Sequence, residues 1–148
     1  MKRLLTRLRE HERGAVLVWV AGSLVAFLGF SALAVDLGFL YLRTTQLQNA
    51  ADAAATAGVV NIPADPDQAN TDAHAAAAAN GFPQPTGADI TTVLDDNSLE
   101  VTLETTVPTF LLRALGRDQF DVVRTSRAEF IKPVRLGSPE GQFGGSSQ

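Results

Sequence analysis

An apolar run near the N-terminus constrains this chain more than any other feature. Residues 14–35 read GAVLVWVAGSLVAFLGFSALAV, which is 22 residues without a charge. At 1.5 Å per residue a helix of this length spans about 33 Å, enough for the roughly 30 Å hydrocarbon core of a bilayer. Five Lys or Arg and only two Glu precede the run, so the positive-inside rule places the N-terminus in the cytoplasm. The sequence predicts a single-pass anchor in contact with membrane lipid.

A secretory signal is the alternative interpretation of the same segment. A basic start, an apolar stretch and the small-residue site Ala32-Leu33-Ala34 also fit a signal peptide, which would release the chain after Ala34. The apolar run is longer than a usual signal core, and its helical pattern continues beyond the site. These two properties favour an uncleaved anchor.

Composition excludes several classes of function. From residue 14 onward the chain has seven basic and fourteen acidic residues, and such an acidic body argues against a nucleic-acid partner. There are no cysteines and two histidines, His11 and His74, so a disulfide framework is excluded and a metal site is not expected. Hydrolase, zinc-protease and P-loop motifs are absent from the sequence, so we expect neither an enzyme nor a cofactor.

The helix is expected to continue far beyond the apolar run. Residues 43–60 contain no proline and are rich in alanine, so one helix is predicted from about Ala15 to about Gly58. Its length would be near 65 Å. Small and apolar residues recur on one face of the stalk, where another helix could approach closely: Leu40, Leu47, Ala51, Ala54 and Gly58.

The rest of the chain predicts a small α+β domain. A second helix is expected over about residues 68–79, followed by strands over about 90–94, 99–107 and 119–131. A short crossover helix is expected over 110–115. The domain plan is a basic cytoplasmic segment at 1–13, a transmembrane and stalk helix at 14–60, an extracytoplasmic α+β domain at 61–136 and a disordered tail at 137–148. The fold class is therefore α+β, with a small sheet of about three strands.

Asp36 is the most informative single residue. A carboxylate at the end of an apolar helix must reach water, a headgroup or a partner. It either lies at the outer interface or pairs with a neighbouring subunit or assembly factor. The small-residue pairs Gly22/Ala26 and Ala34/Gly38 would permit helix packing within the membrane.

Three segments in a fixed order resemble a known family. These are Glu12-Arg13-Gly14-Ala15-Val16, then Ala34-Val35-Asp36-Leu37-Gly38, then LQNAADAAA over residues 47–55. Together they resemble the N-terminal region of the TadE/TadG-like proteins of the tight-adherence (Tad, or Flp) pilus-assembly system. The later stretch VPTFLLRALG and the strand ending at Ser126-Arg127-Ala128 are also similar to the extracytoplasmic part of such proteins.

The resemblance implies a bacterial, pilin-like membrane protein of the inner membrane, active in pilus assembly or cell adhesion, with other pilin subunits or assembly proteins as partners. Related pilins are cut after a glycine that follows basic residues, a position that Gly14 and Ala15 match. Those pilins usually carry a glutamate five residues later, where this chain has Trp19, which favours the uncut TadG-like type. The alternatives are a filament-forming pilin processed after Gly14 and a secreted binding module released after Ala34. Copies of this chain are also expected as partners, in a homo-oligomer or filament.

Overall fold

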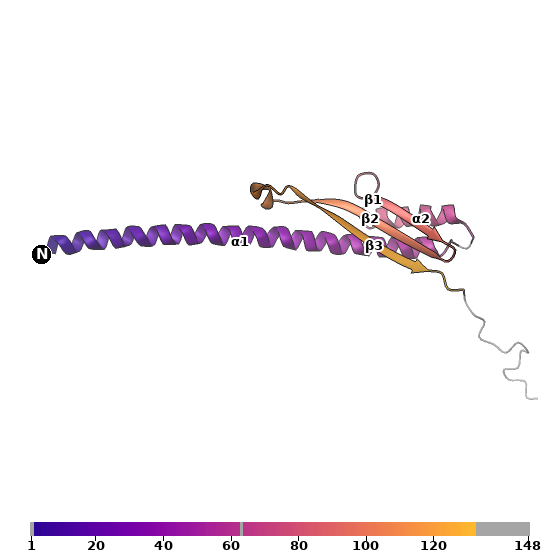
Figure 1. Ribbon diagram of the computed structural model, residues 1–148, viewed down its shortest axis with the longest axis horizontal. Coiled ribbons are helices and arrows are strands. Elements are labelled where there is room, and N and C mark those ends of the chain that lie inside the picture. The colour runs from indigo at the N-terminus through magenta and orange to yellow at the C-terminus, as the bar shows by residue number, and fades with distance from the viewer. Residues whose placement is uncertain (1, 63, 133–148) are drawn as a thin grey trace, which may run out of the picture.

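One very long helix organises the whole molecule. The computed structural model describes residues 2–62 and 64–132, and the tail expected to be disordered (137–148) lies outside this part. Helix α1 runs unbroken over Lys2–Val59, 58 residues, so it is about 87 Å long. Its first half stands free, and the remaining elements gather around its second half (Figure 1).

The start of this helix differs from the sequence prediction. A start near Ala15 was expected, but the helix already begins at Lys2. Residues 2–13 contain neither proline nor glycine and are mostly Leu, Arg, Lys and Glu, all good helix formers. A single glycine costs a helix only about 1 kcal/mol, so Gly14 does not interrupt it.

Helix α2, Pro66–Ala79, folds back against the end of α1. Asp65 caps its start, since the carboxylate accepts a hydrogen bond from the Gln68 backbone N–H at 3.0 Å, and Pro66 occupies the first turn. The helix ends at Asn80, and Gly81 follows with φ of 93°, the left-handed conformation common after a helix. The expected helix is therefore confirmed, with a start two residues earlier.

Three strands form an antiparallel sheet in the order β1-β2-β3: Asp89–Asp95, Ser98–Pro108 and Gln119–Glu129. The central strand β2 pairs with β1 from Asp95↔Ser98 to Asp89↔Glu104, and with β3 along its whole length. The period-two pattern predicted for β2 is confirmed, because Leu99, Val101 and Leu103 are fully buried while Glu104 and Thr106 on the other face are exposed.

The short helix between β2 and β3 was predicted as a crossover, and this was wrong. Because β2 and β3 are antiparallel neighbours, the connection is a hairpin that needs no crossover. It carries a single 3-10 turn, η1, over Leu112–Leu115. The connection projects back toward the N-terminal half of α1 (Figure 1).

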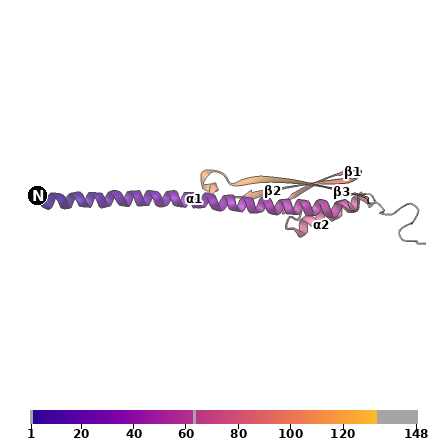
Figure 2. The ribbon, with the colours of Figure 1, turned by 90° about the horizontal axis from the view of Figure 1, so that it is seen from below.

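The core is built on both sides of α1. The sheet lies along one side of this helix and α2 along the other (Figure 2). Gly58 lies between the two layers, where there is no room for a larger residue. A Cβ atom added to Gly58 would collide with the Leu99 side chain of the sheet and would lie 2.6 Å from the Ala69 carbonyl oxygen of α2. Small residues at the centre of the stalk therefore let both layers approach closely. The buried apolar residues of this part of α1 are Leu47, Ala50, Ala51, Ala54, Ala55 and Val59.

Candidate functional site

The Asp36 carboxylate binds the backbone of the β2–β3 connection. Its Oδ1 accepts a hydrogen bond from the Phe110 N–H at 2.9 Å, and its Oδ2 accepts from Leu111 at 3.0 Å and Leu112 at 2.6 Å. More than seventy residues separate the partners in sequence. Asp36 is only 4% exposed. The carboxylate thus satisfies three N–H groups where the chain leaves β2 and enters η1.

We call residues 109–117 the tip loop. Further hydrogen bonds close it at its base: the Thr109 N–H donates to the Asp118 carbonyl at 2.9 Å, and the Thr109 hydroxyl donates to the Arg117 carbonyl. Gly116 has φ of 85° and ends η1, with its N–H donating to the Arg113 carbonyl. The tip loop is therefore a closed turn, ordered by its own bonds and by Asp36.

Aromatic contacts extend the attachment along α1. The rings of Phe39 and Phe110 meet edge to face with centroids 5.1 Å apart, and the Arg43 guanidinium lies 5.5 Å from the centre of the Phe39 ring. Both Phe39 and Arg43 follow Asp36 on the helix. The loop is thus attached at the point where the apolar run of α1 gives way to the stalk.

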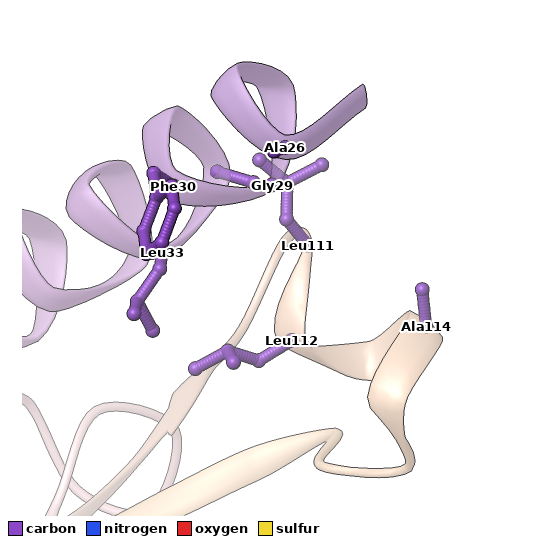
Figure 3. A pocket seen from close by; sticks show the side chains of 8 residues that line it. Ala26, Gly29, Phe30, Leu33, Leu111, Leu112 and Ala114 are labelled. Atoms are coloured by element: carbon purple, nitrogen blue, oxygen red, sulfur yellow. The ribbon is translucent and has the colours of Figure 1, made fainter. Parts of the chain in front are cut away.

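An apolar groove lies between the tip loop and α1. Its volume is about 620 Å³, and Figure 3 shows side chains from the helix facing those of the loop across it. We call it the tip groove. Its lining residues are Ala26, Gly29, Phe30, Ala32 and Leu33 of α1 together with Leu111, Leu112 and Ala114 of the loop.

The residues predicted as a processing site (Gly14 and Ala15) or as membrane or subunit contacts are mostly exposed. Among them, Ala26 lines the tip groove and Asp36 binds the loop. Gly14, Gly22 and Gly38 lie on the bare helix, where a Cβ would meet nothing within 4 Å. Ala15 and Ala34 are also exposed.

The predicted packing face of the stalk lies inside the chain's own domain. Leu47, Ala51 and Ala54 are fully buried, Gly58 is buried and Leu40 is half-buried. The sheet and α2 of the same chain occupy this face. The sequence pattern suggested another helix or a neighbouring subunit as its partner, and the part of the chain that is described already supplies a helix and a sheet.

The tip loop was not recognised as part of a site from the sequence. Its signal is the apolar stretch TFLLRAL within an acidic domain, bounded by Pro108 and Gly116. The partner groups of Asp36 are backbone N–H groups, which every residue except proline carries. No sequence pattern could therefore have marked them.

Residues 14–35 of α1 are apolar and almost all exposed. By length and composition the helix over Gly14–Val59 could cross a membrane, and its most apolar 18-residue window has no buried residue. Within residues 14–62 and 64–132 the structure brings together no group of three His, Asp or Glu side chains that could hold a metal. The architecture is that of an α+β protein whose small domain packs around the second half of its own long N-terminal helix.

A comparison with protein families gives a match that covers most of this helix. Residues 14–64 match the family described as "Putative Flp pilus-assembly TadE/G-like", which confirms the resemblance seen in the sequence. The match covers the apolar run, Asp36 and the stalk, and indicates involvement in Tad/Flp pilus assembly and association with a membrane. Curated proteins and solved structures yield no match to the chain.

Proposed function

We propose that this protein is a structural, single-pass component of a Tad/Flp-type pilus assembly or adhesion system. Its N-terminus lies in the cytoplasm, its apolar run crosses the inner membrane of a bacterium, and its α+β domain lies outside. It acts by holding and presenting this domain to other pilus-assembly or pilin subunits rather than by catalysis.

One observation carries this proposal: a single helix contains both the Tad match and two halves of opposite character. Apolar side chains between residues 16 and 30 are 59–78% exposed, whereas those on one face between residues 47 and 59 are buried in the domain. An exposed apolar surface of this size is unfavourable in water and is typical of a membrane or protein interface. The domain is therefore fixed rigidly at the membrane surface by its own helix.

Asp36 supports the choice of an intact anchor over a secreted module. Release after Ala34 would leave Asp36 as the second residue of a frayed helix end, and would remove every α1 residue that lines the tip groove. The attachment of the tip loop thus depends on helix that precedes the candidate signal-peptidase site.

The absence of cysteine gives a direct topology test. Single cysteines replace Thr6, before the apolar run, and Thr91, exposed on β1. In intact cells with a permeable outer membrane, a membrane-impermeant maleimide should label T91C, and should label T6C only after lysis. Labelling of both variants in intact cells would contradict the orientation.

Intact mass and N-terminal sequence of the native protein separate the alternatives. A chain starting at or near Met1 and found in membranes supports the anchored component. A chain starting at Ala15 in sheared filaments would instead make it a pilin processed after Gly14. A soluble chain starting at Val35 would contradict anchoring.

A further inference from the structure

The tip groove is placed at a definite depth along the apolar run. The midpoint of residues 14–35 falls between Leu24 and Val25, and every α1 residue of the groove lies after it. If the run spans the bilayer as proposed above, these residues lie in the outer half of the hydrocarbon core, which is about 15 Å deep. The tip loop, held against the same stretch of helix, must then reach below the membrane surface.

Irregular backbone is normally excluded from hydrocarbon, because each unsatisfied N–H or C=O group costs several kcal/mol there. In the tip loop, by contrast, most backbone N–H groups have a hydrogen-bond acceptor within the chain. Of the nine backbone N–H groups from Thr109 to Arg117, seven donate hydrogen bonds. Asp36 accepts three of them, and carbonyl groups of residues 111–113 and 118 accept the other four. The loop thus satisfies most of its backbone N–H groups, which lowers the cost of placing it in a membrane.

The side chains of the loop fit the same environment. Phe110 and Leu111 are 54% and 46% exposed at the far end of the hairpin, where water would otherwise meet them. Arg113 and Arg117 are exposed on the same loop of an otherwise acidic body, next to one exposed carboxylate, Asp118. Long arginine side chains can extend from an apolar site toward phosphate groups at the membrane surface.

We propose that the tip loop inserts into the outer leaflet beside its own transmembrane helix, and that a phospholipid acyl chain fills the tip groove. Asp36 makes this insertion possible by satisfying the loop backbone, and Arg113 and Arg117 contact the lipid phosphates. The occupant is lipid rather than a second protein chain because the helix wall of the groove belongs to the apolar run, which the proposed anchor places in lipid, and the loop wall is also apolar. This inference rests on the proposed membrane anchor.

Depth-dependent quenching tests the insertion. The full-length chain is placed in phospholipid vesicles with brominated acyl chains, which quench nearby tryptophan. The native Trp19 reports on the helix itself. In a W19F background, L111W and A114W report on the tip loop, and V93W, on exposed β1, is the matched control. Thermal unfolding of each variant, monitored by circular dichroism, verifies that the domain is folded.

We expect Trp19, L111W and A114W to lose most of their emission in brominated vesicles, and V93W to lose none. Quenching of Trp19 without quenching at either loop position would overturn the inference and leave the anchor intact. Disulfide-linked dimers of an L111C variant under the same conditions would then assign the groove to a second copy of the chain. Unquenched Trp19 would overturn both the insertion and the proposed anchor.

Discussion

At the residue scale, one carboxylate connects the two functional halves of the chain. Asp36 was identified in the sequence because a charge at the end of an apolar run requires an explanation. Its environment could not be predicted: both expected partners, the outer interface and another subunit, lie outside the chain. The structure adds an internal one, the backbone of residues 110–112. An ionised carboxylate is suited to this role because it only accepts hydrogen bonds.

Replacement of Asp36 should release the tip loop without unfolding the domain. In D36A the amides of Phe110, Leu111 and Leu112 lose their acceptor, so we expect their hydrogen exchange to accelerate roughly tenfold or more. Amides of the central strand β2, such as Leu103, should be unaffected because they belong to the sheet.

The matched control is D52A, on the same helix. Asp52 is exposed and accepts a hydrogen bond from the Gln48 side chain at 2.9 Å, remote in sequence from the loop. Exchange in the tip loop should be unchanged in D52A. Equal exchange of the loop amides in D36A and the unsubstituted protein would refute the role assigned to Asp36.

At the element scale, helix α1 serves as the middle layer between a sheet and a helix. This arrangement requires small side chains where the helices meet. On α2 these are three buried alanines spaced four residues apart, which pack against α1: Ala69, Ala73 and Ala77. The periodicities of the strands and the capping signals of α2 are local, so the sequence predicted these elements within a few residues.

At this scale the sequence could not show which element packs against the small-residue face of the stalk. A stripe of small residues on the stalk shows that something packs closely, and it does not distinguish a neighbouring chain from elements later in the same chain. The hairpin between β2 and β3 was missed for a related reason. An apolar segment between two strands fits a crossover helix or a long hairpin tip equally well, and only the strand pairing decides between them.

Enlarging one buried alanine should destabilise the layer between α1 and α2. In A73L the larger side chain has no space against α1, so we expect a loss of about 1–3 kcal/mol in the free energy of unfolding. A75L makes the same change two residues away on the exposed face of α2 and should change stability by less than about 0.5 kcal/mol. Chemical denaturation of the detergent-solubilised chain gives both values. Equal stability of the two variants would show that this layer is not tightly packed.

At the scale of the whole molecule, the proposed anchor and the domain share one long helix, so the depth of the helix in the membrane would set the position of the domain. The buried core of the domain uses α1 from residue 47 onward, and the tip loop contacts the helix at Phe39, at Asp36 and before Asp36. No flexible linker separates the apolar run from the domain, since α1 is continuous through both. In the proposed anchor, the helix therefore sets the orientation of the sheet relative to the membrane.

A charge at the centre of the apolar run should separate anchoring from folding. Val25 is 69% exposed and lies outside the domain core, so V25R should leave the domain folded. In a membrane, arginine at the centre of a helix costs about 2.5–3.5 kcal/mol of insertion free energy. We expect V25R to shift from the membrane pellet toward the soluble or degraded fraction after alkaline extraction. V93R, with a similarly exposed valine on β1, should remain in the pellet at the level of the unsubstituted protein. If V25R were retained as fully as V93R, the run would not be held across the bilayer by its apolar surface, and a protein partner would have to cover it instead.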